Sequence, residues 1–414
     1  FGGSLGEVVA EKVCKVQELA LRQGAPCLAL HDSGGARIQE GVESMSGYVD
    51  VCFRNVQSSG VVPQLALIMG PCAGGSVYSA ALSDFVIMVR PSGRMFVTGP
   101  EVVKAVLGEE VTLEELGGAE VHGRGSGAAH FVVDDEPAAM ALARRLLSFL
   151  PANNLGDAPR TAPQDPVGSG GLLDLVPAEA NQSFDMRDVL AAIVDAGDLL
   201  EVHELWAPNM VTTLARLGGR AVGIVANQSL HLAGTLDVDA SIKAARFVRF
   251  CDAFNLPIVT FVDTPGYFPG KAQEFGGIIR NGAKLAFAYC EATVPKLTVV
   301  VRKAYGGAYG SMGARNTGVD LTWAWPTAEL AVMGAEGAIQ ILYRRELEAA
   351  PERREELLAA YRERFASPYA AAEGGFVDDV IDPRDTRRLL ISGLETLEGK
   401  RVERPARKHG SVPL

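Results

Sequence analysis

Short apolar runs alternate along this chain with segments of helical periodicity. Pro, Asp or Gly residues bound four of these runs, which predicts buried strands at 27–30, 65–69, 258–262 and 297–301. Residues 11–22 and 241–254 carry apolar side chains at helical spacing. Strands that alternate with helices in this way predict an α/β fold built in layers.

The same pattern occurs twice, at an almost constant spacing. Lys12 and Lys243 are 231 residues apart, as are Asp32 and Asp263. Further along, five residues of the first half match five of the second half at a spacing of 232: Pro63, Leu65, Gly74, Gly75 and Ser79 against Pro295, Leu297, Gly306, Gly307 and Ser311. Because many matches occur in one order, the sequence predicts two fused copies of one domain.

A segment rich in proline and glycine separates the two copies. Residues 151–180 hold five prolines and four glycines, a composition that propagates neither a helix nor a sheet. We therefore expect an N-terminal domain at 1–150, a surface linker at 151–180 and a C-terminal domain at 181–414. Residues 336–366, rich in Glu and Arg, are typical of a solvated helical excursion.

A glycine-rich turn follows the second predicted strand of each copy. It reads Gly70-Pro71-Cys72-Ala73-Gly74-Gly75 in the first copy and Lys303-Ala304-Tyr305-Gly306-Gly307-Ala308 in the second. Such a turn leaves backbone N–H groups without partners where a helix begins, and glycine lets a ligand approach them closely. Tight packing of helix on strand would explain one such pair. Two equivalent pairs favour two oxyanion holes, each donor of which contributes roughly 10²–10³ in rate.

Composition narrows the classes of partner. The 414 residues carry 39 basic and 50 acidic side chains, for a net charge of −11, and 48% are hydrophobic. An acidic chain repels phosphate backbones, so we expect no nucleic-acid partner. No apolar run approaches the ~20 residues of a membrane span, and no basic-then-apolar leader is visible, so we expect no membrane partner and no signal peptide. The six cysteines form no CxxC pair, and the histidines show no metal-ligand spacing.

No acid, base or nucleophile accompanies the two glycine turns. Ser76 stands where a phosphate-binding loop requires lysine. We interpret His31, at a strand end, as structural, and Cys72 as a small residue lining the pocket rather than a nucleophile. Two oxyanion holes without a base favour chemistry in which the substrates bring their own proton acceptor.

Six strings carry a resemblance to the carboxyltransferase (β) subunits of biotin-dependent acyl-CoA carboxylases, of the propionyl-CoA carboxylase type. They lie at 32–41 (DSGGARIQEG), 70–75 (GPCAGG), 244–249 (AARFVR), 261–266 (FVDTPG), 306–309 (GGAY) and 408–410 (KHG), and the resemblance runs from Phe1 to Leu414. It implies two tandem crotonase-like β-β-α superhelix domains, in agreement with the duplication.

The resemblance also implies a reaction. Carboxybiotin gives its CO₂ to the α-carbon of a short- or medium-chain acyl-CoA, and the ureido anion left behind removes the α-proton. By resemblance, the N–H groups of Gly74 and Gly75, here called the first cradle, hold the thioester oxygen. Those of Gly307 and Ala308, the second cradle, hold the ureido oxygen. The near symmetry of the copies leaves open which cradle serves which oxygen.

The same resemblance implies two sets of binding residues. Those for the acyl-CoA are Gly34, Gly35, Ala36, Ala73, Gly74 and Gly75. Those for biotin are Gly266, Tyr267, Phe268, Gly306, Gly307 and Ala308. Propionyl-type members often carry Asp where this chain has Gly310, a position associated with acyl length. Removing a side chain enlarges a pocket, so we expect acyl groups bulkier than propionyl to be accepted.

Cofactors and partners follow from what the chain lacks. It contains no Ala-Met-Lys-Met string for biotin attachment and no phosphate-binding loop for ATP. We therefore expect a partner, the biotin carboxylase and biotin carboxyl carrier (α) subunit, to supply biotin. We expect no metal in this chain. The resemblance implies a homohexameric core in an α6β6-type assembly, in the cytoplasm or, in a eukaryote, the mitochondrial matrix. Members normally carry further residues ahead of the point that matches Phe1, so we expect an N-terminal part to be missing.

Two other functions remain open. A related decarboxylase subunit of a sodium-pumping complex would run the same half-reaction backwards, and its partner would be a membrane protein. A non-catalytic scaffold would keep the fold as an assembly platform, although intact glycine pairs in both copies argue against it.

Overall fold

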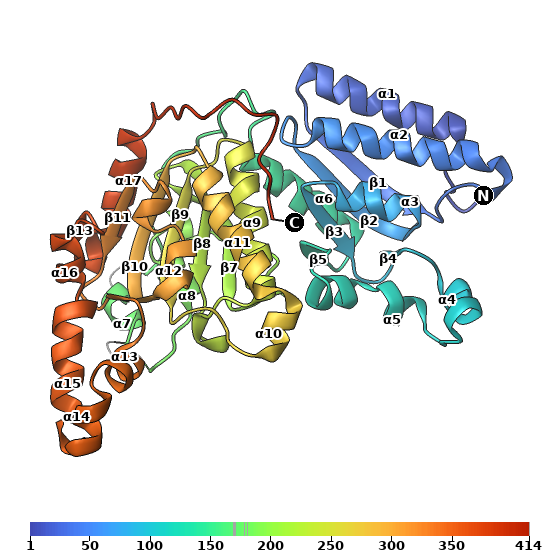
Figure 1. Cartoon of the computed structure of the whole chain (residues 1–414). Coiled ribbons are helices and arrows are strands. Elements are labelled where there is room, and N and C mark those ends of the chain that lie inside the picture. The colour runs from blue at the N-terminus through green and yellow to red at the C-terminus, as the bar shows by residue number, and fades with distance from the viewer. Residues whose placement is uncertain (169–170, 178, 180, 414) are drawn as a thin grey trace. The chain divides into compact units, whose positions relative to one another are not determined.

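Two units, each with its own largely parallel sheet, make up the chain (Figure 1). The computed structural model describes residues 1–168, 171–177, 179 and 181–413. The first unit comprises Phe1–Pro159, Val202–Trp206 and Ala253–Asn255, and the second comprises Arg160–Glu201, Ala207–Asp252 and Leu256–Leu414. Leu414 itself lies outside the described residues.

The first unit contains a five-stranded parallel sheet in the order β1-β2-β3-β5, with β4 paired to β2. Its helices and strands are α1 (Glu7–Gln23), β1 (Cys27–Ser33), α2 (Val42–Ser58), β2 (Gln64–Ala73), α3 (Gly75–Ala81), β3 (Phe85–Val89), β4 (Arg94–Phe96), α4 (Pro100–Leu107), α5 (Leu113–Gly117), β5 (Phe131–Val133) and α6 (Glu136–Ser148). Helices α1 and α2 lie side by side (Figure 1).

The rest of the chain forms an eight-stranded sheet in the order β13-β11-β10-β9-β8-β7-β6, with β12 paired to β10. Its strands are β6 (Leu200–Val202), β7 (Met210–Leu217), β8 (Arg220–Asn227), β9 (Ile258–Thr264), β10 (Lys296–Tyr305), β11 (Leu321–Ala324), β12 (Glu329–Ala331) and β13 (Asp379–Val380). Its helices are α7 (Leu172–Leu175), α8 (Met186–Ala191), α9 (Val238–Ala253), α10 (Lys271–Gly276), α11 (Ile278–Glu291), α12 (Gly306–Ser311), α13 (Ala335–Leu342), α14 (Arg344–Ala349), α15 (Arg354–Tyr361), α16 (Pro368–Glu373) and α17 (Thr386–Thr396). Strands β7 and β8 are antiparallel.

The predicted duplication is confirmed by the strand pairing. Strand β1 pairs in parallel with β2, and β9 pairs in parallel with β10. Two isolated bridges, Leu5 with Ala36 and Leu236 with Tyr267, occupy positions 231 residues apart in the two copies. Each unit also shifts its register just before the glycine turn, so each sheet presents that turn at the same place.

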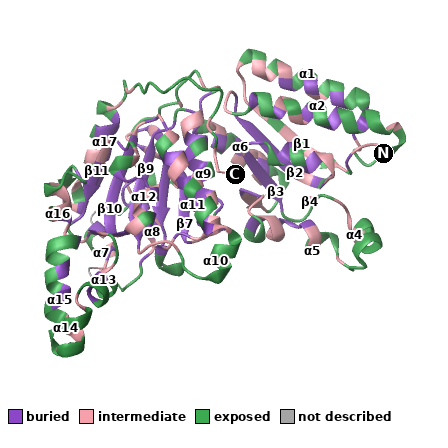
Figure 2. Ribbon diagram, in the orientation of Figure 1, coloured by how far each residue is buried: buried purple, intermediate pink, exposed green. Residues whose placement is uncertain are grey.

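The two copies differ in how deeply the first predicted strand is buried. Strand β9 is buried at every position, whereas Leu28 and Leu30 on β1 are 38% and 60% exposed (Figure 2). The prediction of a buried strand at 27–30 is therefore wrong in part. The reason is position in the sheet: β1 is an edge strand, while β9 lies between β8 and β10.

The segment between the copies is more ordered than its composition suggests. It contains the short helix α7, and Leu172 and Val176 are buried in the large core of the second unit. Residues 171–177 are thus anchored by apolar side chains, unlike the surface linker expected. Gly170 and residues 169, 178 and 180 lie outside the described residues.

The predicted excursion at 336–366 consists of helices α13 to α15. It has a small core of its own, made by Ala335, Ala338, Ile339, Leu357, Leu358 and Tyr361. Helix α14 is almost wholly exposed (Figure 2). The excursion is therefore a packed helical subassembly rather than a single solvated helix.

Candidate active site: two glycine cradles

The first cradle lies where β2 ends and α3 begins. Gly74 has φ 58° and ψ −126°, a backbone conformation open to glycine, and α3 starts at Gly75. A Cβ on Gly35 would lie 3.1 Å from the carbonyl oxygen of Ala73. The fold thus brings the predicted acyl-CoA residues Gly34 to Ala36 against Ala73 to Gly75.

One predicted donor of this cradle is already in use. The Gly74 N–H donates to the carbonyl oxygen of Phe96 at 3.4 Å. The expectation that the N–H groups of Gly74 and Gly75 both hold the thioester oxygen is corrected for Gly74, because its N–H has this partner within the chain. Gly75 is the first residue of α3, where N–H groups have no acceptor within the helix, so its N–H is the first candidate donor and that of Ser76 is the next.

A tyrosine ring forms the floor beneath Gly75. A Cβ at this position would lie 2.5 Å from Cγ of Tyr48, which is itself buried. Glycine is therefore required at position 75 for packing as well as for access. The Tyr48 hydroxyl is 2.9 Å from Oγ of Ser33, whose Oγ also accepts the N–H of Gly35 at 3.2 Å.

A second set of polar groups lies behind the first turn of α3. Oγ of Ser76 is 3.0 Å from Nδ1 of His31 and accepts the thiol of Cys72 at 3.2 Å. Cys72 is fully buried, and burial raises its thiol pKa to about 11. The expectation that Cys72 lines the pocket is wrong, because its side chain packs into the core behind the turn.

The second cradle repeats this arrangement at the end of β10. Gly306 also has φ 58°, and α12 starts there, so Gly307 and Ala308 lie in its first turn. A Cβ on Gly307 would lie 3.8 Å from Cε2 of Tyr267, an ordinary contact. The fold therefore brings Tyr267 against Gly307, so these two of the residues predicted to bind biotin lie together.

Tyr267 is also linked to the helix itself. Its hydroxyl donates to Oγ of Ser311 at 2.8 Å, and that hydroxyl donates to the carbonyl oxygen of Gly307 at 3.0 Å. Gly266 has open space around the position of a Cβ, and the side chain of Phe268 is at the surface. Both helices are short, so their direct N–H donors count for more than any helix dipole.

Gly310 lies one turn further along α12. A Cβ there would meet no atom of the described chain within 4 Å. Space for a larger side chain or for substrate is therefore available beside the second cradle.

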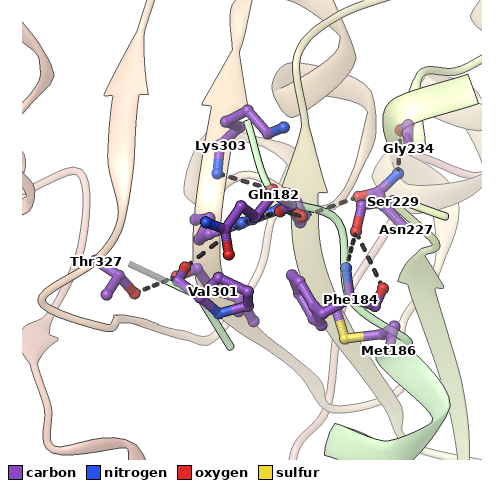
Figure 3. A network of polar contacts seen from close by, with 12 residues as sticks. Gln182, Phe184, Met186, Asn227, Ser229, Gly234, Val301, Lys303 and Thr327 are labelled. Atoms are coloured by element: carbon purple, nitrogen blue, oxygen red, sulfur yellow. Dashed lines mark hydrogen bonds and ion pairs between the residues drawn. The ribbon is translucent and has the colours of Figure 1, made fainter. Parts of the chain in front are cut away.

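A buried ion pair supports the strands that carry the second cradle. Nη2 of Arg302 donates to Oδ2 of Asp263 at 2.9 Å, with 2% and 0% of the two side chains exposed. Oδ1 of Asp263 accepts the N–H of Lys303, and Nη1 of Arg302 donates to the carbonyl oxygen of Gln182 at 2.6 Å. The network continues from Phe184 to Ser229 and from Asn227 to Gly234 (Figure 3). Asp263 is therefore structural and has no oxygen free to act as a base.

His31 is held in its neutral form. Burial lowers its pKa to about 4, and its Nε2 has no hydrogen-bond partner among the described residues. The interpretation of His31 as structural agrees with this environment. Across residues 1–168, 171–177, 179 and 181–413, no group of three His, Cys, Asp or Glu side chains is placed to bind a metal. No helix in those ranges is long and apolar enough to cross a membrane.

Acid should destabilise the fold through His31. An exposed histidine has a pKa of about 6.5, so the unfolded chain binds a proton between that pH and about 4 that the folded chain rejects. The free energy of unfolding should therefore fall as pH drops through this window. Between about pH 7 and pH 5, the thermal midpoint of the wild-type protein should drop further than that of His31→Asn. The exposed His409→Asn serves as the control, and equal drops in all three would contradict the assignment.

Sequence reasoning missed the groups that hold the cradles. Tyr48 belongs to the apolar periodicity of α2 and has no motif of its own. Ser76 enters the sequence analysis only as the residue that stands where a phosphate-binding loop would need lysine. Ser311, a match between the copies, was a usable signal. The remaining contacts join residues far apart in the chain.

Known proteins are similar to this chain over its whole length. A family model described as the carboxyl transferase domain matches residues 1–412. The chain is 56% identical over 419 residues to the propionyl-CoA carboxylase carboxyltransferase subunit of Haloferax mediterranei, covering all of this chain and 81% of that protein. It is 52% identical over 415 residues to the methylmalonyl-CoA decarboxylase subunit alpha of Veillonella parvula, with the same coverages.

A solved structure is similar over nearly the whole chain. The transcarboxylase 12S crystal structure, described as a hexamer with methylmalonyl-coenzyme A and methylmalonic acid bound, has a TM-score of 0.96 and 54% identity. The match covers 99% of this chain and 80% of that one. The expected fold, two tandem crotonase-like α/β domains, is confirmed by this likeness.

Proposed function

This chain belongs to the carboxyl transferase domain family, and we propose that its two cradles hold the two oxygen anions that form when CO₂ passes from carboxybiotin to an acyl-CoA. It is a carboxyltransferase of the propionyl-CoA carboxylase type, like the propionyl-CoA carboxylase subunits that are 51–56% identical to it. The observation that carries the proposal is the repetition of one glycine turn at equivalent ends of β2 and β10.

The chain's own part in the reaction is to bind and to hold charge. Carboxybiotin, as the co-substrate, supplies CO₂ and the ureido nitrogen that accepts the α-proton. In the first cradle, the Gly75 N–H faces the thioester oxygen, which gains negative charge as the enolate forms. In the second, the N–H groups of Gly307 and Ala308 face the ureido oxygen. Each donor stabilises charge that develops in the transition state, which is where binding accelerates a reaction.

The environment of the cradles explains the missing base. Asp263 is committed to Arg302, His31 is neutral and enclosed, and the Cys72 thiol is buried. A carboxylate held in an ion pair, a histidine whose pKa is lowered to about 4 and a buried thiol are all poor acceptors for the α-proton of a bound acyl-CoA. Proton transfer between the two substrates, with the protein providing oxygen-binding N–H groups, fits every one of these observations.

We propose a biotin-bearing partner subunit and a hexameric core for this chain. The hexameric transcarboxylase 12S neighbour and the propionyl-CoA carboxylase β relatives support that assembly. The finer expectation, a biotin carboxylase and carboxyl carrier α subunit in an α6β6 particle, is part of the same proposal.

A transfer assay tests the function. Biotinylated carrier protein is carboxylated with ATP and bicarbonate by a separate biotin carboxylase, freed of nucleotide, and mixed with this protein and an acyl-CoA. We expect labelled CO₂ to appear on the acyl-CoA. No transfer to acetyl-, propionyl- or butyryl-CoA by the folded hexamer would contradict the proposal and favour a scaffold.

The decarboxylase relative supports a second candidate. The same cradles could serve transfer from methylmalonyl-CoA to biotin, since each step is reversible. Co-purification decides between them: a soluble, ATP-dependent biotin carboxylase supports the carboxylase, and a membrane protein with ATP-independent, sodium-linked decarboxylation supports the alternative.

Gly310 should set the acyl-chain preference. Because a Cβ there meets nothing, Gly310→Asp should fold normally and fill space that a longer acyl group would use. Each methylene is worth about 1–3 kcal/mol in such a pocket, so the kcat/KM ratio of butyryl- to propionyl-CoA should fall by about 10-fold or more. Gly310→Ala is the smaller-volume control. A wild-type protein that already rejects butyryl-CoA as strongly as Gly310→Asp would contradict this role.

A further inference from the structure

The two cradles have equivalent backbones but different surroundings. His31, Cys72 and Ser76 of the first copy correspond, at spacings of 231 and 232, to Val262, Ala304 and Ala308 of the second. The second set is fully buried and apolar. These three polar side chains of the first copy therefore have apolar counterparts in the second, so the repeated fold does not itself require them.

The cluster formed by His31, Cys72 and Ser76 restrains a flexible part of the backbone. Gly74 and Gly75 are adjacent glycines, so the backbone that aims the Gly75 N–H has unusual conformational freedom. Ser76 is the first residue after them with a side chain beyond the backbone. Its buried hydroxyl contacts His31 on β1 and Cys72 on β2, so it ties the first turn of α3 to two strands.

In the second cradle, a different set of hydrogen bonds restrains the glycine pair. Its glycine pair is followed by Ala308, which cannot form a hydrogen bond through its side chain. Instead, Tyr267 donates to Ser311, and Ser311 donates to the carbonyl oxygen of Gly307. A serine hydroxyl thus holds each glycine pair: that of Ser76 in the first turn of α3, and that of Ser311 at the end of α12.

We propose that Ser76 is a positioning residue of the first cradle: its hydroxyl, held by His31 and Cys72, keeps the Gly75 N–H directed at the substrate oxygen. This inference rests on the proposed function. Ser76 touches no reacting atom through its side chain, so its effect is on the orientation of a donor. Misplacement of a catalytic group by an ångström costs up to about 10²-fold in rate, and loss of one anchor should cost about tenfold.

The second copy supplies the variants that test this. Ser76→Ala and His31→Val install the residues found at the equivalent buried positions, Ala308 and Val262, so both should fold. Each should lower kcat for CO₂ transfer to propionyl-CoA about tenfold, with KM changed less than about twofold. His31→Asn, which keeps a polar atom near Nδ1, should retain most of the rate.

Ser79→Ala is the matched control. Ser79 is a buried serine on the same helix, bonded to Oδ1 of Asn55 at 2.8 Å, on a helical turn beyond the cradle. It should lose stability comparably while keeping kcat. Equal kcat values for Ser76→Ala and Ser79→Ala, with both proteins folded, would overturn the proposal.

Amide hydrogen exchange gives a readout that does not depend on activity. The Val77 amide, which donates to the carbonyl oxygen of Gly74 at 3.3 Å, should exchange faster in Ser76→Ala than in Ser79→Ala or wild type. Unchanged exchange there would also overturn the anchor. If the wild-type protein transfers no CO₂, the proposed function fails, and the exchange result still shows whether Ser76 holds the turn, so the two failures are distinguishable.

Discussion

Replacing Gly307 by proline should lower kcat for CO₂ transfer about 10²- to 10³-fold while the protein stays folded. Proline removes the N–H of Gly307, one of the two donors of the second cradle. Its ring is tolerated in the first turn of a helix, where the N–H has no helical acceptor to lose. The measurement is single-turnover transfer from carboxylated carrier protein to propionyl-CoA, beside the thermal midpoint and the hexamer fraction.

Gly307→Ala isolates the N–H from the side chain. A Cβ at this position makes an ordinary 3.8 Å contact with Tyr267, and the N–H is kept. We expect this variant to retain kcat within about threefold, because the donor that stabilises the oxyanion is intact. If proline and alanine at position 307 behave alike, the cradle is not an oxyanion site, and the mechanism proposed above is wrong.

Replacing Arg302 by methionine should destabilise the second unit by about 3–5 kcal/mol. The change leaves the fully buried Asp263 carboxylate without its ion-pair partner and removes the donor to the Gln182 carbonyl oxygen. Chemical denaturation followed by tryptophan fluorescence measures the loss, since Trp323 and Trp325 lie in the core of that unit. Arg344→Met, at an exposed ion pair with Glu348, should show no measurable change.

A second substitution should recover part of this loss. Asp263→Asn keeps an oxygen for the Lys303 N–H and removes the charge, so the double variant with Arg302→Met should be more stable than Arg302→Met alone. A double variant no more stable than the single would mean that the contacts of Arg302 with backbone carbonyls, rather than the ion pair, dominate. The first copy holds Asp32 and Gly70 at these positions, so the pair is specific to the second copy.

The repeat explains why so much of the fold could be predicted. Residues that match at one spacing occupy equivalent places, so the equivalence of the strands and of the glycine turns could be predicted by counting along the chain. Predictions that depend on what covers an element were weaker. The exposure of Leu30 on an edge strand, and the burial of Leu172 in a segment expected to be a linker, depend on neighbours that the local pattern does not contain.

By itself, the sequence determined that the chain is duplicated, that each copy carries a glycine turn after a buried strand, and that these turns offer N–H donors without a nearby catalytic base. The glycine turns are local features, because backbone conformation and glycine spacing are encoded within a few residues, and the duplication can be seen by comparing the two halves of the sequence. Tertiary structure alone decided which N–H groups of the glycine turns already have a partner and which side chains support those turns. The Gly74 N–H is taken by Phe96, Tyr48 supports Gly75, and Arg302 is neutralised by Asp263, since hydrogen bonds and packing form between residues that folding brings together from distant strands and loops.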